Sequence, residues 1–269
     1  MLLIAWGGRL IRRLGFEEER TPYEAQTHNA RFWSEGWVSR QLYCLNCGAE
    51  RLERLPNNTP VGDFVCQSCS EQYELKSKAG RLAKSVPDGA YQTMLQRLNS
   101  QENPSLILLG YDRDRRRVSN LAVIPKHFFI PSLIQKRKPL ADTARRAGWI
   151  GCNILVDRVP EAGRVIVVKD GVTLPREQVL ETWRRTCFLR DERASARGWL
   201  IEVLKCVEDI GRAEFGLADV YAFESRLRIL YPGNSHVREK MRQQLQVLRD
   251  AGFIEFLGRG RYRRKLPHH

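Results

Sequence analysis

The amino-acid sequence predicts a mixed α/β (α+β) domain, followed by a smaller domain of helices that ends in a hairpin. Short apolar runs at 106–109, 121–124 and 165–168 are bounded by turn residues and are typical of buried strands. Stretches with helical apolar spacing lie among these runs, which favours a mixed core. The chain has 269 residues, a length that suits two domains of ordinary size.

Changes in composition along the chain place the expected domain boundaries. Residues 1–30 mix apolar, basic and acidic stretches without a recognisable chemistry, so their role stays open. We expect the first domain at 31–185, a polar linker at 186–197 and the second domain at 198–269. Helices are expected in the second domain at 199–210, 217–230 and 236–250, before a basic hairpin at 253–264. Three helices followed by a hairpin is the order of a winged helix-turn-helix, whose third helix enters the major groove.

Charge points to a polyanionic partner. Lys and Arg number 45 against 31 Asp and Glu, a formal charge of +14, and nucleic acid is the commonest partner of so basic a chain. The third helix offers side chains that can pair with bases or phosphates: Arg238, Lys240, Arg242, Gln243, Gln244 and Arg249. The hairpin adds cations suited to the DNA backbone: Arg259, Arg261, Arg263, Arg264 and Lys265. The alternative is a solvated charged tail. No apolar run reaches the ~18 residues of a membrane span, so we expect no membrane partner.

Two Cys-x-x-Cys pairs predict a structural zinc site. Cys44 and Cys47 form the first pair, Cys66 and Cys69 the second, and 18 residues separate the pairs. That spacing lies in the usual range for structural zinc, and four thiolates complete a tetrahedral site. Disulfides or unligated thiols are the alternative. The pattern favours metal and a reducing, cytoplasmic location.

Acidic residues in this basic chain suggest a second metal site. If strand 61–65 pairs with strand 72–76, Asp63 can lie near Glu74, while Glu74 and Lys76 share one strand face. Two carboxylates facing one space suit Mg²⁺, and an adjacent lysine could hold or activate a water. Two carboxylates and a lysine are the smallest set of side chains that metal-assisted phosphodiester hydrolysis requires. Glu-x-Lys alone is a weak signal, and a solvated strand face is the alternative reading.

Several separated motifs between Arg31 and Lys265 resemble the dam-replacing, DpnI-type family of restriction endonucleases, which are PD-(D/E)XK nucleases. They are Tyr43-Cys44-x-x-Cys47-Gly48, Asp63-Phe64-x-Cys66-x-x-Cys69-Ser70-Glu71, Glu74-Leu75-Lys76-Ser77-Lys78, Asp88-Gly89-Ala90-Tyr91, Thr143 to Asn153 and Arg242 to Asp250. The resemblance implies a zinc-bearing PD-(D/E)XK nuclease core joined to a winged helix. It further implies Asp63, Glu74 and Lys76 as catalytic residues, Mg²⁺ and Zn²⁺ as cofactors, and a bacterial or archaeal cytoplasm.

The resemblance implies that the substrate is double-stranded DNA, cut at G-A-T-C sites whose adenine is N6-methylated. We expect the enzyme to be a monomer. Lys78, Arg145, Arg146, Trp149 and Asn153 fall in its motifs and become DNA-binding candidates. Burying one methyl group is worth only ~0.8 kcal/mol, so strong methyl dependence needs more than one contact. We expect Trp149 to supply an apolar one, against the alternative of a core tryptophan. Rival readings are a non-enzymatic zinc and winged-helix regulator, or the same nuclease with another target.

Overall fold

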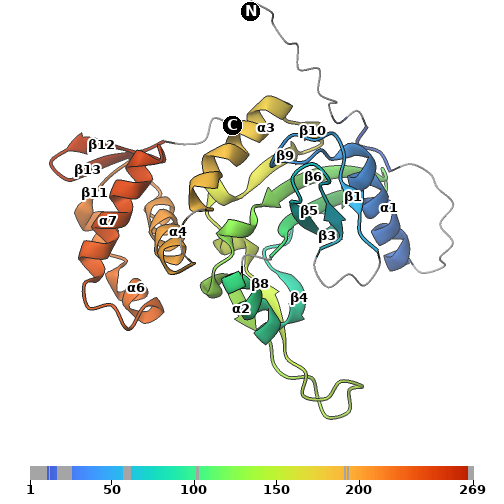
Figure 1. Ribbon diagram of the computed structural model, residues 1–269, viewed down its shortest axis with the longest axis horizontal. Coiled ribbons are helices and arrows are strands. Elements are labelled where there is room, and N and C mark those ends of the chain that lie inside the picture. The colour runs from blue at the N-terminus through green and yellow to red at the C-terminus, as the bar shows by residue number, and fades with distance from the viewer. Residues whose placement is uncertain are drawn as a thin grey trace, which may run out of the picture. The chain divides into compact units, whose positions relative to one another are not determined.

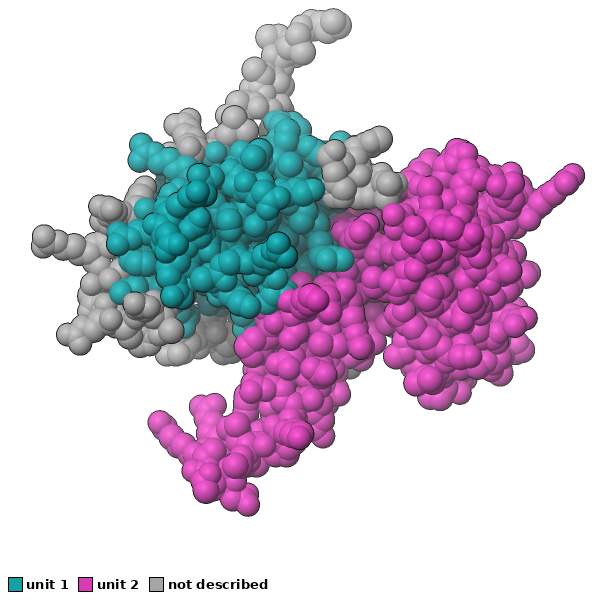
Figure 2. Space-filling view, turned by 180° about the vertical axis from the view of Figure 1, so that it is seen from behind, with its two compact units in different colours: residues 1–83, 102–126, 164–184 teal, residues 84–101, 127–163, 185–269 magenta. Residues whose placement is uncertain are grey.

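The computed structural model describes residues 11, 13–16, 26–56, 62–100, 103–190, 192 and 194–265. Most of the N-terminal segment 1–30, and part of the strand expected at 61–65, lie outside these residues. Contacts divide the chain into two compact units (Figure 2). Unit 1 comprises residues 1–83, 102–126 and 164–184, and unit 2 comprises residues 84–101, 127–163 and 185–269.

Unit 1 is built on a seven-stranded sheet (Figure 1). The strand order is β1 (Glu53–Arg54), β2 (Phe64–Val65), β3 (Gln72–Ala79), β5 (Ser105–Asp112), β6 (Arg117–Ile124), β9 (Val165–Lys169) and β10 (Val172–Thr173). Only the β3–β5 pair is parallel. The apolar runs at 106–109, 121–124 and 165–168 lie in β5, β6 and β9, and the first two are fully buried. A continuous apolar run forms a strand here because both faces of the central strands are covered.

Two helices of unit 1 contact strand β3. Helix α1 (Gln26–Gln41) is joined to β3 by a hydrogen bond from Ser34 Oγ to Ser77 Oγ at 3.0 Å. Helix α3 (Arg176–Thr186) buries Trp183, whose ring centroid lies 6.4 Å from that of Tyr73 on β3. Strand β3 is therefore held by its sheet neighbours and by both helices.

Unit 2 contains a small sheet in the order β4 (Val86–Ala90), β8 (Gly151–Ile154) and β7 (Ile134–Lys136), with helix α2 (Tyr91–Ser100) packed on it. Residues 137–150 connect β7 to β8 as a long loop that extends well beyond the small sheet (Figure 1). Short 3-10 turns complete the connections of the two units, at Lys126–Phe128, Pro131–Leu133, Val156–Arg158, Glu161–Gly163 and Cys187–Leu189.

The rest of unit 2 has the order expected of a winged helix: α4 (Ala194–Asp209), β11 (Glu214–Gly216), α5 (Leu217–Tyr221), α6 (Glu224–Leu230), α7 (Val237–Asp250), β12 (Ile254–Gly258) and β13 (Arg261–Arg264). Strand β13 lies between β11 and β12 in an antiparallel sheet. One expectation needs correction, because the helix predicted at 217–230 is two helices that break at residues 222–223. Helix α4 also begins inside the segment that we expected to be a linker.

Gly163, a buried glycine of unit 2, packs so closely against the ring of Phe128 that no side chain fits between them. A methyl group on Gly163 would lie 2.4 Å from Phe128 Cδ1, in a ring that is fully buried. We expect Gly163→Ala to destabilise the protein by roughly 1–3 kcal/mol through overpacking, which thermal unfolding would detect as a lower Tm. Gly89→Ala is the matched control, because no atom lies within 4 Å of the added methyl. Equal Tm values for the two variants would contradict this account.

Candidate metal centre and active site

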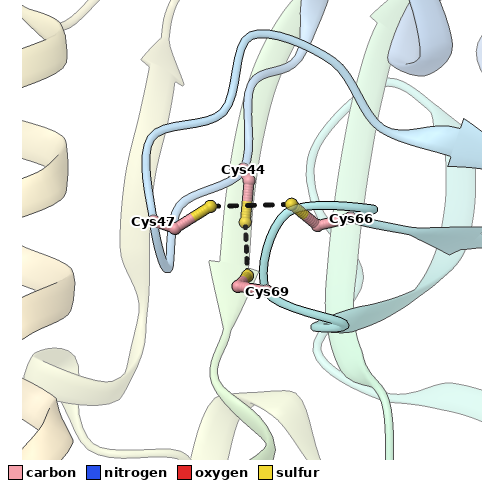
Figure 3. A group of neighbouring side chains, drawn as sticks. All are labelled: Cys44, Cys47, Cys66 and Cys69. Atoms are coloured by element: carbon pink, nitrogen blue, oxygen red, sulfur yellow. Dashed lines mark hydrogen bonds between the residues drawn. The ribbon is translucent and has the colours of Figure 1, made fainter.

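Four cysteine side chains converge between two turns of unit 1 (Figure 3). The Sγ atoms of Cys44 and Cys69 are 3.6 Å apart, as are those of Cys47 and Cys66. All four Sγ atoms lie within 4.8 Å of one another, and all four cysteines are free thiols. Tetrahedral zinc with Zn–S bonds of ~2.3 Å places its sulfurs about 3.8 Å apart. The cluster therefore fits a structural Zn²⁺ and leaves no position for a substrate.

The two turns that present these cysteines repeat one backbone pattern. The amide of Gly48 donates to the carbonyl of Cys44, and that of Ser70 donates to the carbonyl of Cys66, each at 2.8 Å. Gly48 and Ser70, the residues after the second cysteine of each pair, both have a positive φ, of 78° and 58°. Each turn is thus closed over five residues and directs both of its thiols to one side. Burial raises the pKa of the Cys47 thiol to about 11.

Side chains of β3 alternate between two environments. Glu74 and Lys76 share one face, where each side chain is about a quarter exposed and Lys76 Nζ lies 2.6 Å from Glu74 Oε1. Lys78, next on that face, is exposed. Tyr73 points to the opposite face and is fully buried. The Glu-x-Lys pair therefore lies on the partly exposed face of β3, opposite the buried Tyr73.

Asp63 is bonded to the middle of β3 by two hydrogen bonds. Its amide donates to the carbonyl of Tyr73 at 2.8 Å, and its Oδ2 accepts the amide of Leu75 at 2.7 Å. Phe64 pairs with Tyr73 where β2 meets β3. The carboxylate of Asp63 is thus held at Leu75, the residue between Glu74 and Lys76. The structure brings together the three residues that the sequence nominated as catalytic.

Two charged residues of α1 join this group, and sequence reasoning missed both. Glu35 is buried. Its carboxylate accepts a hydrogen bond from Arg31 Nε at 2.5 Å and also forms an ion pair with Arg54. Arg31 Nη2 lies 3.7 Å from Asp63 Oδ1. The hydrogen bond to Glu35 raises the pKa of Arg31. Arg31 thus connects a buried glutamate to a proposed metal ligand, and its spacing of four residues from Glu35 was the available sequence signal.

Helix α7 presents a stripe of arginines beside its buried face. Arg238, Arg242 and Arg249 are exposed and follow one another at spacings of four and seven residues, which places them on one side of the helix. Arg238 lies over the ring of Tyr221, and Arg242 donates to the Tyr221 hydroxyl. The other polar candidates are Gln243, which is exposed, and Lys240, which donates to it at 2.7 Å.

One expected base-reading residue is misplaced. Gln244 is 4% exposed and lies on the same face of α7 as the buried Met241, Leu245 and Leu248. Because that face packs into the winged-helix core, we remove Gln244 from the candidate DNA contacts. The burial of Met241, Leu245 and Leu248 confirms the core face that their spacing predicted.

The β12–β13 hairpin also carries its predicted cations. Arg259, Arg261 and Arg263 are exposed, while Arg264 is half-buried. Arg261 and Arg263 both pair with Glu214 on β11, at 2.9 and 2.8 Å. A single carboxylate thus orients two guanidinium groups on the surface of the hairpin.

Candidates of the small sheet lie in and beside the 137–150 loop. Arg145 and Arg146 are exposed, and Asn153 on β8 donates to Gln135 at 3.3 Å. Trp149 is half-exposed rather than a core residue. Its ring lies against Gly151, where an added methyl group would approach Trp149 Cη2 to 2.7 Å. Gly151 therefore leaves room for an indole ring that water can still reach.

Comparison with known protein families identifies the family of this chain. A sequence model of the DpnI Dam-replacing family matches residues 14–192, and a model of the Dam-replacing HTH domain matches residues 195–264. The chain belongs to the Dam-replacing family. Membership implies a restriction endonuclease that depends on DNA methylation, with a DNA-binding helix-turn-helix domain at its C-terminal end. Among the described residues, no helix is both long and apolar enough to cross a membrane.

Proposed function

We propose that this Dam-replacing family member hydrolyses double-stranded DNA at G-A-T-C sites whose adenine carries an N6-methyl group, with Mg²⁺ as cofactor. The observation that carries the chemical part is the Asp63 carboxylate bonded to the Leu75 amide between Glu74 and Lys76. A surface that only grips DNA has no use for partly exposed carboxylates, because they repel phosphates. The target sequence rests on family membership.

Asp63, Glu74 and Lys76 each have a separate role in the proposed hydrolysis of the phosphodiester bond. Asp63 and Glu74 offer carboxylate oxygens, which are the donors that Mg²⁺ takes in proteins. When bound there, Mg²⁺ supplies charge stabilisation at the scissile phosphate. Lys76 Nζ positions the attacking water and offsets the charge that develops on the phosphate oxygens. The water attacks phosphorus in line, leaving a 5′-phosphate and a 3′-hydroxyl. Arg31, 3.7 Å from the Asp63 carboxylate, would offset part of its negative charge.

Recognition of the methyl group would combine several contacts, each of which favours the methylated site only modestly. Because the site is palindromic, the duplex offers two methyl groups at close range. A hydrophobic contact discriminates one methylene by only ~1–3 kcal/mol, so several contacts are needed. Trp149 provides a partly exposed apolar ring between exposed arginines and a small sheet. Arg238, Arg242 and Gln243 on α7 would sample the same sequence from the winged helix.

The test is a digest of one plasmid, grown with and without adenine methylation at G-A-T-C, in Mg²⁺ and in EDTA. Cutting of the methylated plasmid alone, and only with Mg²⁺, is the expected result. Cutting of both plasmids would keep the nuclease and overturn the methyl dependence. Tight binding without cutting would favour a non-enzymatic DNA-binding regulator. Trp149→Ala with unchanged rate and methyl preference would remove Trp149 from the proposal.

The hairpin arginines give a separate prediction about DNA affinity. Arg259→Gln combined with Arg261→Gln should weaken binding to every DNA sequence and flatten its salt dependence. The slope of log K against log salt is negative, and each lost phosphate contact lowers its magnitude by about 0.9, so we expect the magnitude to fall by about 2. Arg113→Gln, in the exposed turn between β5 and β6, is the control variant. An unchanged slope in the double variant would show that these arginines contact no phosphate.

A further inference from the structure

Two side chains outside the zinc ligands reach the cysteine sulfurs. Tyr73 Oη lies 3.2 Å from Cys44 Sγ, and Asn46 Nδ2 lies 3.3 Å from Cys69 Sγ. Asn46 is itself oriented by α3, because its Oδ1 accepts the indole N–H of Trp183 at 3.3 Å. A metal-bound thiolate has no proton to give, so in the loaded site both contacts run from the hydroxyl and the amide to sulfur. These donors would offset the excess negative charge of four thiolates on one Zn²⁺.

Tyr73 has a second set of bonds that connects it to the catalytic group. Its carbonyl accepts the amide of Asp63, and its strand neighbours are Phe64 on β2 and Ser105 on β5. The side chain is fully buried, so close packing couples the position of the ring to that of the strand. Glu74 follows directly on the opposite face. A displacement of Cys44 therefore reaches Asp63 and Glu74 through a single residue.

We infer that Tyr73 is a positioning residue: it hydrogen-bonds the zinc-bound thiolate of Cys44 and thereby makes the zinc site set the register of Asp63 and Glu74. Zinc then has a role beyond holding two turns together, because the catalytic strand takes its position from the metal centre. The catalytic meaning of this link rests on the proposed function. The hydrogen bond and its effect on β2 and β3 do not.

The sequence supplies a matched control one residue before a zinc ligand. Tyr43 is also a buried tyrosine, and its hydroxyl has no hydrogen-bond partner among the described residues. Tyr73→Phe and Tyr43→Phe thus remove the same atom from similarly buried rings beside Cys44. Only the first removes a bond to sulfur. Any difference between the variants reports the bond rather than the loss of a hydroxyl from the core.

The first measurement is the rate of zinc release from the full-length protein to a chromogenic chelator. Loss of a partner in the outer shell of a metal site typically weakens the metal 10–100-fold, so we expect release from Tyr73→Phe to be about tenfold faster. Tyr43→Phe should release zinc at the wild-type rate. In cobalt-substituted protein, the thiolate-to-metal absorption band should move to longer wavelength in Tyr73→Phe alone. Wild-type release and an unmoved band would overturn the hydrogen bond.

The second measurement follows amide hydrogen exchange of residues 62–76 with zinc in excess. Tyr73→Phe should accelerate exchange in this segment about tenfold and leave β9 unchanged, whereas Tyr43→Phe should match the wild type. Faster zinc release with unchanged exchange at 62–76 would overturn the positioning role. If Tyr73→Phe does not fold, zinc release from Asn46→Ala tests whether hydrogen bonds to the cysteine sulfurs retain the metal. Amide exchange of residues 62–76 in the wild-type protein, with and without chelator, then tests whether the zinc site positions Asp63 and Glu74. Failure of the wild type to cut DNA would remove the proposed function and leave these results standing.

Discussion

Glu74→Gln is expected to lower the rate of DNA cleavage by about 10³-fold while DNA affinity in the absence of Mg²⁺ stays within about twofold of the wild type. The amide keeps the shape of the side chain and removes the charge that would hold the metal. A loss of ~4 kcal/mol of transition-state stabilisation, ordinary for a catalytic metal site, corresponds to that factor. Single-turnover cleavage of a methylated duplex, with affinity measured in EDTA, separates the two effects.

The double variant Asp63→Ala with Glu74→Ala extends this test to the whole carboxylate pair. It should bind the methylated duplex and never cut it. Glu50→Gln serves as a control because Glu50 is an exposed carboxylate of the same unit, outside the proposed site. Cleavage by Glu74→Gln at a rate near that of Glu50→Gln would eliminate Glu74 as a metal ligand.

Cys66→Ser is expected to abolish zinc binding and to disrupt the folded structure around the β2–β3 hairpin. Cys66 is fully buried, and its turn joins the strand after Asp63 to the strand that carries Glu74 and Lys76. Zinc binding by four-cysteine sites contributes on the order of 10 kcal/mol to folding, which exceeds what the hairpin could replace by packing. Zinc content and thermal unfolding of the purified variant would check this, and a strong chelator should have the same effect on the wild type.

A cysteine outside the cluster provides the comparison. Cys206 on α4 is as buried as Cys66 but lies in unit 2 and is not part of the four-cysteine cluster. Cys206→Ala should keep a full zinc complement and lose only the packing of one small side chain. Wild-type unfolding of Cys66→Ser, with its zinc gone, would mean that the metal is not structural.

Local pattern was sufficient where function depends on spacing along the chain. The four-cysteine cluster was predictable because two residues between cysteines let both thiols of a pair face one ion, and the structure repeats one turn for each pair. Glu74 and Lys76 share a face because strand side chains alternate, and that alternation is written in the sequence. Met241, Leu245 and Leu248 were predictable as core because their spacing follows the helical repeat. Gln244 falls on the same face by that repeat, so its burial was also predictable.

Contacts between distant segments were decided only by the tertiary structure. Nothing near Arg31 in the chain indicates that its guanidinium approaches Asp63, since this depends on how α1 packs against β3. Glu35 was equally hidden, because α1 has no clear apolar stripe to place it. The break between α5 and α6 was missed because both helices share one apolar pattern.

By itself, the sequence determined the mixed α+β fold class, the C-terminal helix-turn-helix domain and the four-cysteine cluster, because each depends on residue type at short, regular intervals. Tertiary structure alone decided which of these groups meet: Tyr73 with Cys44, Asp63 with Leu75, and Arg31 with both Glu35 and Asp63. The physical reason is that hydrogen bonds and ion pairs form over a few ångströms in space. The positions of side chains far apart in the chain follow from the packing of the whole sheet and its helices.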